Sequence, residues 1–180
     1  MRVIAGALKG RRLKAPTWEG LRPTSDKLRE TLFNILAPRI VGARVLDGYA
    51  GTGAAGIEAI SRGAAWVTFA ESDRRAQQLI ADNLAHCGVT DGYAIIRATV
   101  ARAIDDLGAA SLDIMLLDPP YDDLQAEIVM ASAGAVLAPG GLVVLEHARR
   151  RKTPETVGPL VRVRQVTSGD STLSFYSWPH

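Results

Sequence analysis

Apolar and polar positions along the chain follow a repeating order that predicts strands alternating with helices. Short apolar runs, typical of buried strands, lie near residues 43–47, 66–71, 93–98, 112–117 and 141–147. Segments with helical spacing follow near residues 54–62, 73–86, 100–107 and 123–137. This order is typical of a parallel sheet with helices on both faces.

The carboxyl-terminal part departs from this alternation. Two strands near residues 160–166 and 172–178 have only a turn between them, so they must pair antiparallel. Together the segments predict an α/β fold, with a doubly wound, mostly parallel seven-stranded sheet that ends in an antiparallel strand pair.

The amino-terminal part adds a small extension to this sheet. Residues 2–15 predict a β-hairpin with two short strands around a Gly/Lys turn. A helix is expected near residues 25–37, with Thr24 or Ser25 as its N-cap and Pro38 at its end.

Charge is distributed unevenly along the chain. Residues 1–44 hold ten Lys and Arg against three acidic residues, whereas residues 45–180 hold eleven against sixteen. A basic arm on a mildly acidic body indicates a polyanionic partner, of which we favour nucleic acid. We therefore divide the chain into a basic arm, residues 1–24, and a main domain, residues 25–180. The cations of the predicted hairpin are Lys9, Arg11, Arg12 and Lys14.

Composition narrows the class of protein further. Of the 180 residues, 47% are apolar and 22% are charged, as in a globular protein with one core. No apolar run approaches the length of a membrane span, and the single cysteine excludes an internal disulfide. Both observations favour a cytoplasmic protein without membrane contact. The three histidines show no metal-ligand spacing, so no metal is expected.

A glycine-rich loop follows the first strand of the main domain. Gly51 to Gly56 satisfies the spacing G-x-G-x-x-G, and Glu71 lies twenty residues beyond Gly51, as in a dinucleotide fingerprint. A nicotinamide-dependent oxidoreductase is therefore an alternative. Asp47 argues against it, because a carboxylate there would repel a pyrophosphate. The same carboxylate suits a cationic ligand such as the ammonium group of S-adenosylmethionine, and Glu71 can accept both ribose hydroxyls.

An acid, two prolines and an aromatic residue follow the strand near residues 112–117. Prolines cannot continue a central strand, so the chain must turn here, at the sheet edge where open α/β sheets bind ligands. The Asp118 carboxylate can accept a hydrogen bond from an exocyclic amine, as can a carbonyl of the turn, while Pro119 and Pro120 have no N–H to compete. Tyr121 offers a ring on which a planar base can stack. The turn therefore suits chemistry on the amine of a base.

These segments carry a resemblance to a known family. The chain resembles the RsmD family of class I S-adenosylmethionine-dependent methyltransferases over nearly its full length. The most specific matching stretch begins with Arg22-Pro23-Thr24-Ser25-Asp26. Other matching stretches are Arg2-Val3-Ile4-Ala5-Gly6, Gly10-Arg11-Arg12-Leu13, Leu46-Asp47, Ala50-Gly51-Thr52-Gly53, Asp118-Pro119-Pro120-Tyr121, Glu146-His147 and Gly169-Asp170.

The resemblance implies an activity and a set of site residues. It implies methyl transfer from S-adenosylmethionine to N2 of a guanine in 16S ribosomal RNA, either free or in an assembling small subunit. It implies a Rossmann-like class I methyltransferase fold, catalysis at Asp118, Pro119, Pro120 and Tyr121, and RNA contact by the cations of the arm. The residues expected to bind the cofactor are Arg22, Thr24, Asp47, Gly48, Tyr49, Ala50, Gly51, Thr52, Gly53, Glu71, Ser72, Thr99 and Val100.

Two positions depart from the family pattern. Gly48 stands where the family usually has an apolar residue, which predicts a looser loop. Thr99 stands where the family often has an acid, so the contact to the adenine amine falls to the Thr99 hydroxyl or to backbone.

Other classes of protein stay open. A DNA adenine-N6 methyltransferase uses a similar acid-Pro-Pro-aromatic turn, although this chain has no room for a separate target-recognition domain. A nicotinamide-dependent oxidoreductase leaves that turn unexplained. A non-catalytic RNA-binding protein with a methyltransferase fold is the third alternative, against which Asp47 and Asp118 argue. We expect a monomer in each case.

Overall fold

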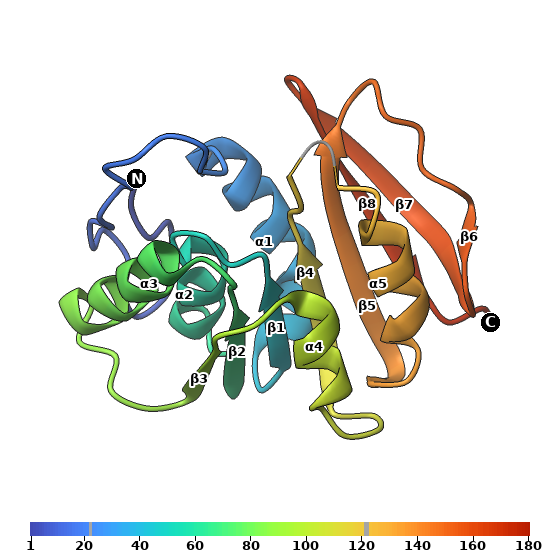
Figure 1. Cartoon of the computed structure of the whole chain (residues 1–180), viewed down its shortest axis with the longest axis horizontal. Helices are drawn as coiled ribbons and strands as arrows, with labels where there is room; N and C mark the ends of the chain where they lie inside the picture. Colours follow the sequence, from blue (N-terminus) through green and yellow to red (C-terminus); the bar gives the residue numbers. More distant parts are fainter. Residues whose placement is uncertain (22, 121–122) are drawn as a thin grey trace.

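One sheet of eight strands runs through the part of the chain that the computed structural model describes, residues 1–21, 23–120 and 123–180. Its strands lie in the order β3-β2-β1-β4-β5-β8-β7-β6 (Figure 1). The mutually parallel strands are β1 (Arg44–Gly48), β2 (Trp66–Ala70), β3 (Tyr93–Ile96), β4 (Leu112–Leu117) and β5 (Leu137–Ala148). The strands beyond β5 pair antiparallel and are β8 (Ser171–Ser177), β7 (Leu160–Ser168) and β6 (Thr156–Val157).

Helices cover both faces of the sheet (Figure 1). They are α1 (Asp26–Ile40), α2 (Ala54–Ser61), α3 (Arg74–His86), α4 (Val100–Asp105) and α5 (Ala126–Ala133). Successive residues of a strand point to opposite faces, so Val45 belongs to the core under α1, α2 and α3, and Leu46 to the core under α4 and α5. The predicted doubly wound, mostly parallel sheet is therefore confirmed. The sequence missed β6, because two residues are too few to show a period.

Helix α1 differs from its predicted end. The helix continues through Pro38 to Ile40, because Ile40 is buried in the core and holds the last turn against the sheet. At the other end, the Ser25 hydroxyl accepts the Leu28 N–H at 3.1 Å and is the N-cap. The Thr24 side chain is therefore available for contacts elsewhere.

The amino-terminal hairpin is shorter than predicted. Its backbone pairs across one bridge, Arg2 with Arg12, instead of forming two strands. The next backbone donors turn to the body of the protein, because Ile4 and Ala5 give their N–H groups to the buried Glu58 carboxylate at 2.9 and 3.1 Å. The arm is thus held against α2 by a carboxylate rather than by strand pairing.

The boundary between α5 and β5 also differs from its prediction. The helix predicted over residues 123–137 covers only Ala126–Ala133, and β5 begins at Leu137 instead of near residue 141. The pairing with β4 shifts register between Leu112 and Ile114, and this irregularity accommodates Pro139 in β5 without a ladder hydrogen bond.

Candidate active site

Four acidic residues lie at the carboxyl edge of four adjacent strands. In the sheet order β2-β1-β4-β5, Glu71 follows β2, Asp47 is near the end of β1, Asp118 follows β4, and Glu146 is near the end of β5. Leu117 pairs with Leu145, so the register places Asp118 and Glu146 side by side. Open α/β sheets bind ligands at this edge, and the candidate site is built on this row of acids.

The loop between β1 and α2 requires left-handed backbone angles. Gly51 and Gly53 have φ of 58° and 81°, which glycine adopts without a steric penalty. Tyr49 has φ of 57°, an angle that is rare for residues with a side chain and is found disproportionately at functional sites. Ala50 and Thr52 are buried between them. A Cβ on Gly51 would lie 3.1 Å from Leu21 Cδ1, so the segment before α1 lies over this loop.

Gly48 is tightly packed, contrary to the looser loop expected from its identity. A Cβ there would lie 2.7 Å from Leu117 Cδ2 and 3.3 Å from Val100 Cγ1. The space that an apolar side chain would fill is therefore already occupied. Val100 is buried beside it, while Thr99 is exposed and caps α4, its hydroxyl accepting the Arg102 N–H at 3.3 Å. A hydroxyl that accepts one hydrogen bond can still donate another.

Asp47 is buried, with 4% of its surface exposed. Its Oδ2 atom accepts the Gly56 N–H at 2.8 Å. Burial, which is the largest cause, and the charges of Asp118 and Glu71 together raise the pKa of Asp47 to about 8, although the Gly56 hydrogen bond lowers it. A buried carboxylate in this position would gain most from a cationic ligand, whose charge would compensate its own.

Close packing explains why Gly56, the last position of the G-x-G-x-x-G spacing, is a glycine. A Cβ there would lie 2.3 Å from Phe69 Cε1 and 3.0 Å from Asp47 Oδ2. Only glycine lets α2 approach β2 closely enough for its N–H to reach Asp47.

Glu71 ties the loop to the end of β2. Its carboxylate accepts the Gly51 N–H at 2.9 Å and the Asp73 N–H at 3.0 Å. Each carboxylate oxygen has a second acceptor direction, so two ribose hydroxyls could still bind. Ser72 is exposed beside it. The predicted cofactor residues of β1, β2 and their loops therefore lie together at one edge.

One threonine joins the two acids at the other end of the row. Thr24 Oγ1 lies 3.2 Å from Asp118 Oδ2 and 3.1 Å from Glu146 Oε2. Glu146 belongs to a stretch that matches the family, but the sequence analysis predicted no role for it. The signal that could have identified it is its position near the end of β5, the strand that pairs with β4 and therefore ends beside Asp118.

Both of these carboxyl groups have raised pKa values. For Asp118, desolvation of the carboxyl group raises the pKa although the residue as a whole is exposed, and the Thr24 hydrogen bond opposes this effect. For Glu146, burial raises the pKa first and the charge of Asp118 raises it further, against the same opposing bond from Thr24. Two neighbouring acids of this kind titrate as a pair and retain a proton more readily than isolated acids do.

The acid-Pro-Pro turn is partly described. Pro119 is buried and Pro120 exposed, and the Pro120 carbonyl accepts the Asp123 N–H at 2.9 Å. Tyr121, predicted to stack on a base, and Arg22, predicted to lie beside the cofactor, are outside the described residues.

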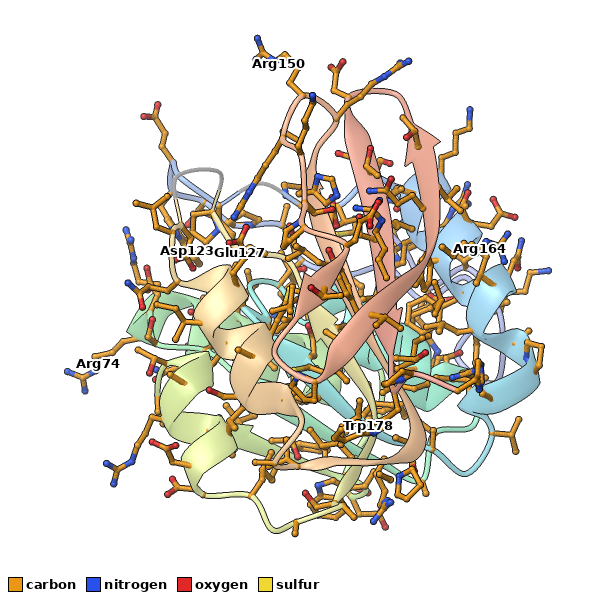
Figure 2. All side chains as sticks on the ribbon, turned by 90° about the vertical axis from the view of Figure 1, so that its right-hand side faces the viewer. Arg74, Asp123, Glu127, Arg150, Arg164 and Trp178 are labelled. Atoms are coloured by element: carbon orange, nitrogen blue, oxygen red, sulfur yellow. The ribbon has the colours of Figure 1, made fainter. Side chains whose placement is uncertain are left out.

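Tyr49 links the glycine loop to the segment before α5. Burial raises the pKa of Tyr49, and the nearby Asp123 carboxylate raises it further, so the phenol stays protonated. Asp123 lies with Glu127 at the start of α5 (Figure 2). Glu127 in turn pairs at 3.5 Å with Arg151, which lies in the basic segment Arg149-Arg150-Arg151-Lys152 directly after β5.

The predicted RNA-contact residues Lys9, Arg11, Arg12 and Lys14 are all exposed on the arm. Hydrogen bonds attach the arm to α2 and α3 rather than to the acid-Pro-Pro turn: Leu8 N–H donates to Ser61 Oγ at 2.9 Å, and Lys14 N–H donates to Asn83 Oδ1 at 2.6 Å. The arm therefore lies on the α2 and α3 side of the molecule (Figure 1), and its four exposed cations make that side basic.

Residues 1–21, 23–120 and 123–180 hold neither a group of metal ligands nor a membrane-spanning helix. In that part of the chain, no three His, Cys, Asp or Glu side chains are grouped as metal ligands. In the same part, every helix is too short or too polar to cross a lipid bilayer.

The sheet is doubly wound, continues into the antiparallel strands β8 and β7, and carries a buried acid, Asp47, beneath its glycine loop. These features define a class I methyltransferase. Comparison with solved structures agrees, since "Putative methyltransferase yhhF from Escherichia coli" superposes with a TM-score of 0.85 at 33% identity, over 98% of this chain and 96% of that one. Residues 1–177 match the family model described as "Conserved hypothetical protein 95".

The chain belongs to that family, the RsmD family. It is 39% identical to "Ribosomal RNA small subunit methyltransferase D" of Escherichia coli K12, over 98% of this chain and 89% of the relative. It is 38% identical to "Putative rRNA methyltransferase YlbH" of Bacillus subtilis 168, over 98% of each chain.

Proposed function

We propose that this protein transfers a methyl group from S-adenosylmethionine to the exocyclic N2 of a guanine in 16S ribosomal RNA. The substrate is the free RNA or an assembling small subunit in the cytoplasm, and the protein acts as a monomer. The name of the Escherichia coli relative, a small-subunit ribosomal RNA methyltransferase, supports the substrate class.

One observation carries the proposal. The buried Asp47 pairs with Leu116 across β1 and β4, so Asp118, the acceptor for an amine, stands only two residues beyond its strand partner at the same sheet edge. A site for a cationic ligand and an acceptor for a base amine are therefore neighbours at one sheet edge. A nicotinamide-dependent oxidoreductase has no use for this pairing.

The residues present fit the cofactor. Asp47 would hold the ammonium group, because its carboxylate is buried and, among the described residues, accepts a hydrogen bond only from the Gly56 N–H. Gly51 and Gly53 would let the methionine part approach backbone, and Glu71 would accept the ribose hydroxyls. When bound, S-adenosylmethionine supplies an electrophilic methyl group on a sulfonium.

Asp118 would position the substrate amine. The lone pair of an aryl amine is conjugated with its ring, so the amine is a poor nucleophile until it is held in a suitable pose. A hydrogen bond from N2–H to an ionised Asp118 supplies that pose, so most of the rate comes from positioning and electrostatics. As the nitrogen gains its methyl group it loses a proton, which Asp118 accepts directly or through water.

The arm would bind the RNA backbone. Lys9, Arg11, Arg12 and Lys14 are exposed, and residues 1–24 are proposed to act as a phosphate-gripping arm that gives affinity but little sequence choice. Because the arm is fixed to α2 and α3, it would hold the RNA beside the glycine loop at a constant distance.

Labelled cofactor tests the proposal. The protein is incubated with labelled S-adenosylmethionine and, in parallel, 16S RNA, small subunits and genomic DNA from a strain lacking the gene, and products are digested to nucleosides. We expect label in N2-methylguanosine from ribosomal material, lost with Asp118→Ala and kept with Asp91→Asn, a change at an exposed acid. Label in N6-methyladenine from DNA would instead support the adenine methyltransferase.

A further inference from the structure

Thr24 has one hydroxyl proton and two carboxyl neighbours. Its Oγ1 lies within hydrogen-bonding distance of Asp118 Oδ2, at 3.2 Å, and of Glu146 Oε2, at 3.1 Å. A hydroxyl can donate to only one acceptor at a time, whereas ionised carboxylates only accept. With both acids ionised, one of the two contacts would be a repulsion between oxygen lone pairs. With one proton on the acid pair, both contacts become hydrogen bonds.

The proton belongs on Glu146 rather than on Asp118. Glu146 lies within β5 and is less exposed than Asp118, which stands on the turn after β4. Burial penalises the charged form of a carboxyl group, so the less exposed acid retains the proton. The pKa of Glu146 is raised by that burial and by the charge of Asp118, in agreement with this order.

We propose that Glu146 is a positioning residue: as a neutral acid it donates to Thr24, and Thr24 donates to Asp118. This chain of hydrogen bonds keeps Asp118 ionised and turned toward the substrate amine. It rests on the proposed function, because Asp118 is taken to be the group that holds N2. Glu146 itself does not touch the substrate.

Other titratable groups of the described residues lie on the elements around Asp118 and Glu146. Asp47 lies close enough to Asp118 for their charges to interact, and Glu71 acts on Asp47 in turn. Helix α1 presents Arg29, but that guanidinium pairs with Asp26 at 3.0 Å. The next residue of β5, His147, points to the opposite face, where its Nε2 lies 2.7 Å from Ser174 Oγ.

The proposal fixes the pH dependence of methylation. Activity rises with pH as Asp118 loses its proton, and it falls again as Glu146 loses its own, because Thr24 can then no longer serve both acids. Glu146→Gln replaces the protonated carboxyl by an amide that donates to Thr24 at every pH. The alkaline fall should therefore disappear in this variant, and the acidic rise should remain.

Single-turnover rates on 16S RNA from pH 5 to 10 test this expectation. Glu146→Ala should be slower than Glu146→Gln by roughly tenfold or more, since it removes a hydrogen bond in a charged network. Thr24→Ser should exceed Thr24→Val by a similar factor, because only serine keeps the hydroxyl. Glu155→Gln, a change at an exposed acid, serves as control. An alkaline fall that persists unchanged in Glu146→Gln overturns the proposal.

Infrared titration of the ligand-free protein gives a readout that needs no methylation. A protonated-carboxyl C=O band should be present near neutral pH, decline at alkaline pH, and lose one component in Glu146→Gln while the component from Asp47 stays. Loss of no component would overturn the proposal even if the enzyme methylates RNA. Conversely, if wild-type protein fails to methylate RNA but the Glu146 component is found, the proposed function fails while the shared proton stands.

Discussion

Replacing Asp47 with Asn should stabilise the ligand-free protein in a pH-dependent way. The carboxyl is buried and its pKa is raised from 3.8 to about 8, so the folded state retains a proton that the unfolded chain releases in that interval. A raised folded-state pKa means that stability is lost as pH rises from about 4 to 8. Asparagine does not titrate, and its side-chain oxygen can still accept the Gly56 N–H.

The magnitude follows from the same shift. Each pH unit within the interval changes the free energy of unfolding by up to about 1.4 kcal/mol. Between pH 5 and pH 8 the upper limit is about 4 kcal/mol, and relaxation around a buried charge reduces this to roughly 1–2 kcal/mol. For a chain of this length, that difference corresponds to about 3–6 °C in Tm.

Calorimetric melting of both proteins at pH 5, 6.5 and 8 measures the effect. Asp113→Asn is a matched control with the opposite sign, because Asp113 pairs with Arg44 at 3.0 Å and this partner lowers its pKa. That half-exposed pair contributes at most about 1 kcal/mol, equally at pH 6.5 and 8.

An advantage of Asp47→Asn that does not grow with pH would refute the reasoning, as would a less stable variant at pH 8. The same protein should bind S-adenosylmethionine about 10- to 100-fold more weakly in calorimetric titration, because a hydrogen bond to a charged group is lost. Undiminished affinity would show that the ammonium group does not bind at Asp47, and it would leave the stability argument unaffected.

Three further changes test the packing and the arm. Gly56→Ala should destabilise the protein by about 1–3 kcal/mol in urea titration, because its Cβ would lie 2.3 Å from Phe69 Cε1, whereas Gly108→Ala meets nothing and should be neutral. Glu58→Gln should speed proteolysis of the arm relative to Glu30→Gln, because the buried Glu58 carboxylate accepts two arm N–H groups and lies 3.8 Å from Arg29; equal rates would contradict this. Replacing Arg11 and Arg12 by Ala should weaken RNA binding and reduce its log–log salt slope by about two, and an effect as large from Arg39→Ala, near Gly140, would show that the arm is not specific.

The parallel half of the sheet was predictable because its signal is local. Runs such as Leu112–Leu117 are continuously apolar and end in turn residues, so their type and position can be read without knowing their neighbours. An acid directly after such a run, such as Asp118, must then lie at the carboxyl edge of the sheet, because the parallel strands all end at that edge. The fold class and the general location of the acids therefore followed from the sequence, although the roles of these residues stay predictions.

The differences arise where a distant contact decides the local structure. Pro38 stays inside α1 because Ile40 reaches the core, and the arm makes one bridge because Glu58, far along the chain, takes its N–H groups. Arg29 lies on the buried face of α1, where helical periodicity predicts an apolar residue, because Asp26 and Glu58 surround it. Glu146 needed the β4–β5 register before it could be placed beside Asp118.

The row of acids links function to stability. Desolvation raises the pKa of Asp47, Asp118 and Glu146, and the charge of Asp118 raises the pKa of Asp47 and of Glu146 further. The ligand-free protein therefore holds acidic groups whose negative charges are poorly compensated. A cationic ligand at Asp47 would remove part of that repulsion and, through Asp118, ease the ionisation that the proposed chemistry needs. Any ligand bound only by the folded state raises stability with its concentration. Here that gain should be larger at pH 8 than at pH 6, because more of the row is then ionised, which is the reverse of the trend for the ligand-free fold.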